Sequence, residues 1–128
     1  MNQKGENKMK ALKVFVTFNW NAFAEGKEFT VRDCSVWTDF NTKKVMGTKV
    51  EVIITKDETD YHLKDGDTKS NLLERLIFKV TKDIRIPANS KVRPVNPRVT
   101  AYGRDYHGNF TNYVNQLAIQ CDDVEIIP

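Results

Sequence analysis

A chain of 128 residues, 40% of them hydrophobic, is long enough for one compact domain and too short for two stable ones. It holds two widely separated cysteines and only two histidines, so a zinc site is not expected, and reduced, buried thiols are favoured over a disulfide. No run approaches the roughly 18 apolar residues that span a bilayer, and residues 1–10 lack the apolar run of a signal peptide, which predicts a cytoplasmic protein without a membrane partner.

The formal net charge of +3 is unevenly distributed along the chain. The whole excess lies before residue 14. Residues 82–104 then carry six basic side chains against one acid, whereas residues 105–128 carry four acids and no base. A basic stripe of this kind could neutralise several phosphates, with an affinity that falls steeply as salt rises. A solvated surface with patchy charge explains the same pattern equally well.

The leading segment has the composition of a flexible arm. Residues 1–10 are polar and basic and lack apolar periodicity, and they precede a single predicted domain over residues 11–128. Apolar side chains alternate over residues 14–20 with the period of a half-buried strand.

The middle of the chain predicts two strands joined by a hairpin, followed by a loop and a third strand. The two strands cover residues 29–37 and 46–54, and turn-forming residues fill 39–44 between them. Residues 55–71 are rich in Asp, Gly, Ser and Thr and predict a loop. A capping signal follows, but the alternation over residues 76–80 favours strand over helix.

The last third of the chain predicts extended structure. Three prolines exclude a regular helix over residues 86–98 and belong at strand edges or bulges. A glycine-bracketed turn over 103–108 precedes strand segments over 112–119 and 124–127. Some five strands of uneven length predict an all-β protein, a five-stranded Greek-key barrel. A β-sandwich, which usually has about seven shorter strands, is the competing architecture.

Motifs of catalysis are missing from the sequence. It contains no phosphate-binding glycine loop, no G-x-S-x-G and no H-E-x-x-H. His62 and His107 lie in polar connections, where exposed histidines are common. The acids of residues 57–67 lack the order and the closing Glu of a calcium loop. The sequence therefore predicts a protein that is not an enzyme and has no metal, cofactor or small-molecule substrate.

Aromatic residues occur in the connections, close to cations. A protein that binds single strands needs ring faces for base stacking beside cations that follow the phosphates. Trp37 is as readily explained as a core residue, whereas Tyr106 has no obvious core to enter. The two hairpins are expected to form one continuous groove. The predicted binding residues are Trp37, Phe40, Lys43, Lys44, Lys49, Tyr61, Arg93, Arg98, Tyr102, Arg104, Tyr106 and Phe110.

Two stretches resemble a known family. Residues 29–44 followed by Gly47-Thr-Lys-Val-Glu-Val-Ile-Ile resemble the opening hairpin of OB-fold single-stranded DNA-binding proteins from phages and conjugative plasmids of Gram-positive bacteria. Residues 91–103 and 117–127 resemble their last two barrel strands. The resemblance implies an OB barrel that coats single-stranded DNA, or RNA, with little sequence preference during phage replication or recombination, or plasmid conjugation.

Two points remain open in the sequence. The long linker and acidic tip of bacterial housekeeping homologues are not seen, and residues 122–128 are interpreted as strand rather than tip. The arm has three possible uses: docking on a neighbouring protomer, contact with phosphates, or none. Two rival functions are kept. One is a non-enzymatic β-sandwich that serves as a structural or protein-interaction module of a phage or mobile element. The other is a nuclease or phosphodiesterase, which would need clustered acids and a metal.

Overall fold

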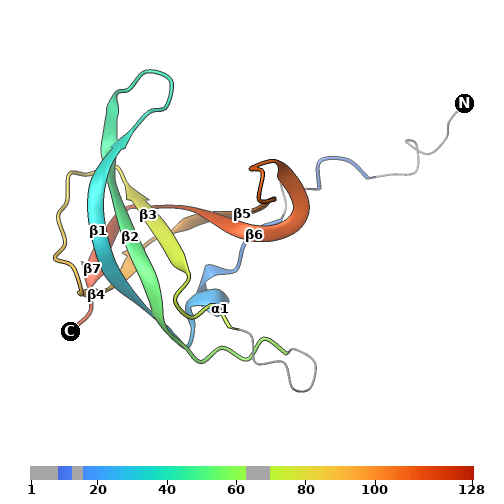
Figure 1. The fold of residues 1–128 in the computed structure, drawn as a ribbon, viewed down its shortest axis with the longest axis horizontal. Helices are drawn as coiled ribbons and strands as arrows, with labels where there is room; N and C mark the ends of the chain where they lie inside the picture. Colours follow the sequence, from blue (N-terminus) through green and yellow to red (C-terminus); the bar gives the residue numbers. More distant parts are fainter. Residues whose placement is uncertain (1–8, 13–15, 63–69) are drawn as a thin grey trace, which may run out of the picture.

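The computed structural model describes residues 9–12, 16–62 and 70–128, and in these ranges it is almost entirely β (Figure 1). No helix in these ranges is long and apolar enough to cross a membrane. The elements are α1 (Trp20–Ala24), β1 (Lys27–Thr38), β2 (Val45–Asp57), β3 (Arg75–Val80), β4 (Lys91–Val95), β5 (Arg98–Arg104), β6 (Phe110–Cys121) and β7 (Asp123–Ile126).

The strands form one mixed sheet in the order β5-β6-β3-β2-β1-β4-β7. Neighbouring strands are antiparallel except β3 and β6, which run parallel. The prediction of an all-β protein is confirmed. The prediction of five strands in a closed barrel is not: the described residues form seven strands, and the sheet, with β5 and β7 at its ends, is not closed into a barrel.

The higher strand count has a local cause. Asn96 and Pro97 separate β4 from β5, and Asp122 separates β6 from β7. Asn96 has a left-handed φ of 50°, and Pro97 has no amide proton to donate to a ladder. The two breaks lie opposite each other in the sheet. Antiparallel pairing continues beyond them in the same register, since Val95 of β4 pairs with Asp123 of β7 and Arg98 of β5 pairs with Gln120 of β6.

Most of the predicted elements are found. β1 and β2 confirm the first hairpin and its two strands, and β3 confirms that strand prevails over helix near residue 75. β7 confirms that residues 123–126 are strand. Residues 1–8 of the predicted arm and residues 63–69 of the predicted loop lie outside the described residues.

Alternating side chains of the strands build the core. On β2, Val50, Val52 and Ile54 are buried while the residues between them face outward. Such a period of two is what a sheet with one covered face requires. The buried hydrophobic residues are Phe29, Val31, Val50, Val52, Ile54, Phe78, Val80, Ile86, Val92, Ile119, Cys121 and Val124.

The predicted first strand is wrong where it can be compared. Residues 13–15 lie outside the described residues, and from Trp20 the chain is helical. The side chain of Asn19 caps α1 by accepting a hydrogen bond from the Ala22 amide at 3.1 Å. Trp20 and Phe23 then share one helix face, and the Trp20 ring stacks on Phe29 at 5.5 Å. Packing of this aromatic pair on the sheet overrides the local alternation.

A buried ion pair joins α1 to the far end of the first hairpin. The side chains of Lys27 and Asp57 are fully buried, with Nζ 3.4 Å from Oδ1. Lys27 Nζ also donates to the Phe23 carbonyl at 2.7 Å and to Thr59 Oγ1 at 2.8 Å. Burial opposes ionisation of Asp57. Hydrogen bonds from Tyr61 Oη and from the Asn71 and Thr59 amides outweigh it and hold the Asp57 pKa well below its usual range.

Replacing one partner of this pair should strongly lower the stability of the protein. Lys27→Met leaves a buried carboxylate unpaired, which should cost about 3 to 5 kcal/mol of unfolding free energy in urea titrations. Lys56→Met is the matched control, because Lys56 pairs with Glu58 on the exposed surface, and it should change stability little. Equal losses for the two variants would contradict the buried-pair account.

The Asp57 carboxylate also predicts how stability depends on pH. A depressed folded-state pKa contributes stability that is fully present above the unfolded value, about 3.9, and is lost as pH falls below it. The difference in unfolding free energy between the wild type and Asp57→Asn should therefore shrink with acidification below about pH 4. A difference that stays constant down to pH 2 would show that ionisation of Asp57 is not involved.

The two thiols are free and differ in environment. Cys121 is fully buried, and burial raises its pKa to about 11, whereas Cys34 is half-buried. Because the thiolate is the reactive form, a thiol reagent should label one cysteine of the native protein and both only after unfolding. Cys34→Ser should abolish the native labelling and Cys121→Ser should leave it. The reverse pattern would contradict the assignment.

Candidate nucleic-acid interface

The turn between β1 and β2 is held by one carboxylate. Asp39 Oδ1 accepts hydrogen bonds from the amides of Thr42 and Asn41, both at 2.9 Å, and these bonds hold the pKa of Asp39 below its usual value. Lys43 has a left-handed φ of 62°, which completes the turn. The first hairpin is therefore a defined structure that projects from the sheet (Figure 1).

This hairpin carries an exposed ring among cations. The Phe40 side chain is 86% exposed, so it contributes almost nothing to the core. Lys43 Nζ lies 5.0 Å from the centre of the Phe40 ring, and Lys44 is exposed beside it. A ring face and two cations are thus available to one ligand.

A second group lies on the outer face of β1, β2 and β3. Trp37 is half-buried and pairs with Gly47, and Lys79 Nζ lies 5.5 Å from its ring centre. A Cβ on residue 47 would lie 1.9 Å from the Val80 carbonyl oxygen, so only glycine fits there. Lys49 lies directly opposite Lys79. Facing like charges destabilise a sheet, and an anion bound between them would relieve that repulsion.

The third group is the hairpin between β5 and β6. The guanidinium carbon of Arg104 lies 4.1 Å from the centre of the Phe110 ring and 5.7 Å from that of Tyr102. Arg104 Nη1 donates to the Gly108 carbonyl, which fixes the side chain against the turn. This cation is held in place between two aromatic residues.

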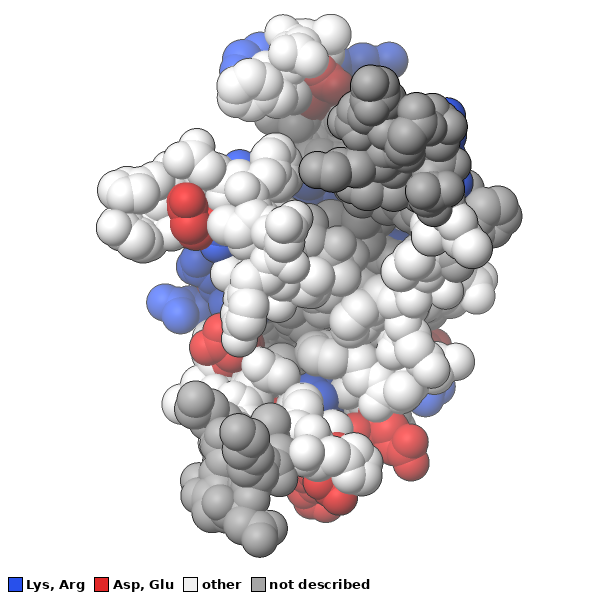
Figure 2. Space-filling model, turned by 90° about the vertical axis from the view of Figure 1, so that its right-hand side faces the viewer, with Lys and Arg blue, Asp and Glu red and all other residues white. Residues whose placement is uncertain are grey.

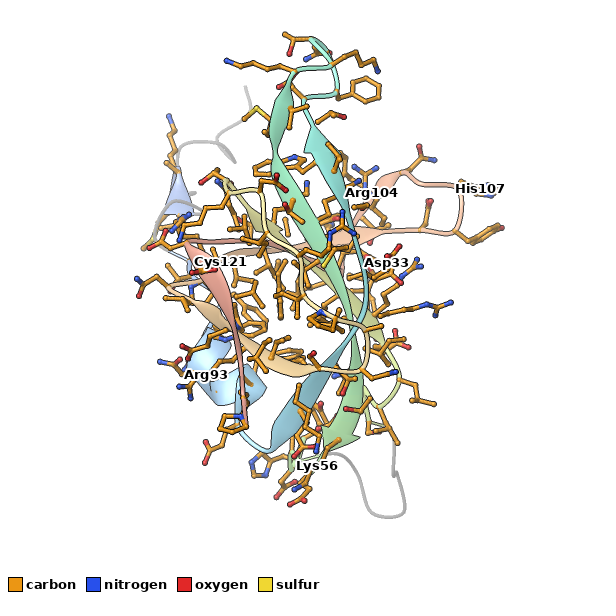
Figure 3. All side chains as sticks on the ribbon, turned by 90° about the vertical axis from the view of Figure 1, so that its left-hand side faces the viewer. Asp33, Lys56, Arg93, Arg104, His107 and Cys121 are labelled. Atoms are coloured by element: carbon orange, nitrogen blue, oxygen red, sulfur yellow. The ribbon has the colours of Figure 1, made fainter. Side chains whose placement is uncertain are left out.

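The tip of this hairpin exposes a second ring. Tyr106 is 93% exposed, and its ring centre is 4.0 Å from that of His107. Asp105 holds the tip by accepting the His107 and Asn109 amides at 2.9 Å each. Figure 3 shows His107 at the end of the hairpin and Arg104 nearer its base. In Figure 2 the two hairpins stand out from the molecule, β1–β2 above and β5–β6 to the left, and the β5–β6 surface is mostly uncharged.

Folding pairs four of the six cations of residues 82–104 with carboxylates. Antiparallel pairing of β4 with β7 and of β5 with β6 brings the basic segment beside the acidic one. The ion pairs that result, or that involve the same stripe, are Lys82 with Asp123, Lys91 with Glu28, Arg93 with Glu125, and Arg98 with Asp122. Hydrogen bonds from Arg98 and Asn96 accordingly lower the pKa of Asp122. Arg93 and Arg98, two predicted binding residues, are therefore compensated.

The cations without a carboxylate partner in the described ranges are Lys10, Lys43, Lys44, Lys49, Lys79, Arg85 and Arg104. Three of them lie over aromatic rings: Lys43 over Phe40, Lys79 over Trp37 and Arg104 over Phe110. In the described ranges, cations without a carboxylate partner therefore lie over aromatic rings at three places.

Tyr61 has a different environment from the other predicted residues. Its hydroxyl donates to Asp57 Oδ2 at 2.6 Å and accepts from Asn71 Nδ2 at 2.9 Å. Its ring lies 5.0 Å from Lys27 Nζ. Tyr61 therefore supports the buried ion pair rather than presenting a free face.

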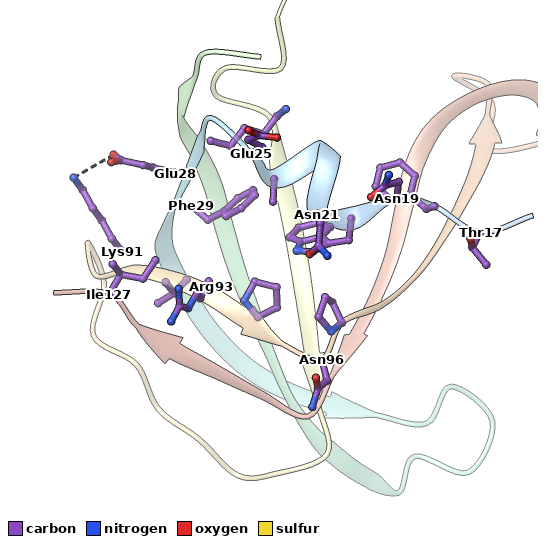
Figure 4. A pocket seen from close by; sticks show the side chains of 17 residues that line it. Thr17, Asn19, Asn21, Glu25, Glu28, Phe29, Lys91, Arg93, Asn96 and Ile127 are labelled. Atoms are coloured by element: carbon purple, nitrogen blue, oxygen red, sulfur yellow. Dashed lines mark ion pairs between the residues drawn. The ribbon is translucent and has the colours of Figure 1, made fainter. Parts of the chain in front are cut away.

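Clefts on the described surface include the following three. One of about 920 Å³ lies between residues 17–21, α1 and β4, and Arg93 lines it (Figure 4). One of about 390 Å³ lies between β3 and β6 and includes Tyr102. One of about 410 Å³ lies between the base of the first hairpin and the β3–β4 connection. Phe40 and Tyr106 line none of these three clefts, and the expectation of one continuous groove stays a prediction.

Two residues of the candidate surface were missed in the sequence. The core residues on either side of Lys79 draw attention away from it in the sequence. Its outward position nevertheless follows from its alternation with the buried residues Phe78 and Val80. Tyr113 lies in a segment that the sequence predicts to be a regular strand, yet it is 78% exposed. The nearby residues Asn112 and Asn115, which are poor strand formers, were the available signal.

Comparisons with protein-family models, with curated proteins and with solved structures gave no match to this chain.

Proposed function

We propose that the protein binds single-stranded nucleic acid without base-specific contacts, and that DNA is its ligand. The observation that carries the proposal is the coincidence of uncompensated cations with accessible rings at Phe40, Trp37 and Phe110. Stacking of bases on rings and neutralisation of phosphates by cations are the two interactions that such binding uses. Arg93, Arg98 and Tyr61 are left out of the proposed surface, because their charges or hydroxyl are already engaged.

The strand connectivity supports an OB-like architecture as part of the same proposal. If β4 with β5 is counted as one interrupted strand, and β6 with β7 as another, five strands remain. Their order is then β1, β2, β3, β6–β7 and β4–β5, and β4 also pairs with β1 through Phe29 and Val92. A Greek-key barrel of five strands that is partly open has this order.

The proposed mode of binding requires no conformational change. Bases would stack on Phe40, Trp37 and the rings of the second hairpin while Lys49, Lys79 and Arg104 contact phosphates. None of these groups reads a base edge, which agrees with little sequence preference. Together with the resemblance of the sequence, this suggests a role in coating DNA in the cytoplasm during phage replication or recombination, or plasmid conjugation.

The charge part of the proposal is tested by two matched double variants. Lys49→Gln with Lys79→Gln should flatten the salt dependence of binding to oligo-dT, lowering the slope of log affinity against log salt by about 1.4 for two lost phosphate contacts. Arg93→Gln with Arg98→Gln changes the net charge equally but removes compensated cations, and should leave the slope almost unchanged. Fluorescence anisotropy over a salt series measures both. Equal slopes for the two double variants would contradict the assignment of the surface.

The stacking part is tested at the hairpin tips. Phe40→Ala and Tyr106→Ala should each weaken binding by about 1 to 3 kcal/mol at every base composition, without loss of stability, since both side chains are exposed. Val45→Ala, an exposed apolar residue of the first hairpin, is the control and should bind as the wild type does.

Matched single-stranded DNA, duplex DNA and RNA complete the same titration. Tighter binding of the DNA single strand is expected. If the wild type binds none of the three, the proposed function is wrong, and a protein-interaction module is favoured.

A further inference from the structure

A bulge in β6 presents Tyr113, an aromatic residue to which the proposed function gives no role. Tyr102 pairs with Gln116, but the next residue of β5, Gly103, pairs with Thr111. Residues 112–115 therefore have no partner on β5 and are pushed out of the ladder. Large bulges of this kind re-aim side chains, and they are common beside functional sites.

The bulge is held by specific contacts. A Cβ on residue 103 would lie 2.0 Å from the Tyr113 carbonyl oxygen, so this close approach requires glycine. The Asn115 amide side chain accepts from the Arg104 amide at 3.0 Å and donates to the Arg104 carbonyl at 2.8 Å, in place of a backbone partner. Thr111 Oγ1 accepts from the Tyr113 amide at 3.0 Å. The backbone that carries Tyr113 is thus fixed.

The Tyr113 side chain, in contrast, is free in the described structure. It is 78% exposed, and none of the ring–ring contacts within the described ranges involves it. A ring on a fixed backbone has only two side-chain torsions to immobilise when it is covered, so covering it costs little entropy.

We propose that Tyr113 stacks one base of a bound single strand, as a contact site additional to the hairpin tip; this rests on the proposed function. The charge of the surroundings favours a nucleic acid over a second protein copy. The bulge is anchored on the backbone of Arg104. The guanidinium of Arg104 lies on Phe110 and has no carboxylate partner in the described ranges. One oxygen of the neighbouring Asp105 carboxylate accepts two amides of the turn. An exposed aromatic ring on the same hairpin as a cation without a carboxylate partner in the described ranges suits a base and its phosphate.

The test compares substitutions at one position with a neighbour in the same bulge. Tyr113→Ala and Tyr113→Leu should weaken binding to a 16-nucleotide oligo-dT, a length of about one site, by about 5- to 150-fold. Tyr113→Phe keeps the ring and should bind as the wild type does. Val114→Ala removes an exposed apolar side chain one residue away and should also leave the affinity unchanged. Urea titration of each variant should give the wild-type midpoint.

The outcomes separate this inference from the function on which it rests. A wild-type protein that fails to bind overturns both. Wild-type binding with an unaffected Tyr113→Leu variant overturns the stacking site alone. If light scattering without DNA shows that the wild type is an oligomer and that Tyr113→Leu dissociates it, the ring is covered by a second copy and the inference is wrong.

Discussion

The antiparallel register that continues from β4–β7 into β5–β6 decides where the protein keeps free charge. It sets Arg93 beside Glu125 and Arg98 near Asp122, so two cations of the basic segment are compensated by acids of the last segment. Among the described residues, most cations without a carboxylate partner lie on the first hairpin, on the β2–β3 face and on the second hairpin, and Lys10 and Arg85 lie elsewhere. The candidate interface is therefore a consequence of strand pairing as much as of composition.

Rigidity at the opposite end of the first hairpin comes from the buried pair of Lys27 and Asp57. Two charges removed from water are tolerated only when their remaining hydrogen-bonding groups are satisfied. Here the Phe23 carbonyl, Thr59, Tyr61 and the Asn71 amide supply those bonds. One network thus ties α1, β1, β2 and the following connection together, and it fixes the sheet from which the hairpins project.

The hairpins share a design in which polar side chains and glycines, not core packing, set the backbone. Asp39 and Asp105 each accept two amides of their turns. Gly47 and Gly103 allow approaches of backbone that any side chain would block. Because the backbone is held in this way, aromatic residues at these places are not needed for the core. They can remain exposed without weakening the fold.

The sequence alone determined the parts that depend on local period and turn chemistry: strands β1, β2 and β3, the first hairpin with Phe40 and Lys43, and the turn that exposes Tyr106. It failed where a distant partner decides. Trp20 became helical because it packs on Phe29, and Tyr61 turned inward to Asp57. Arg93 and Arg98 pair with acids more than twenty residues away. Tyr113 stays in β6 but lies in a bulge without a partner on β5, where its carbonyl approaches Gly103. Alternation and spacing report which face a residue takes, but only the tertiary structure brings its partner beside it, because pairing between strands joins residues that the chain keeps far apart.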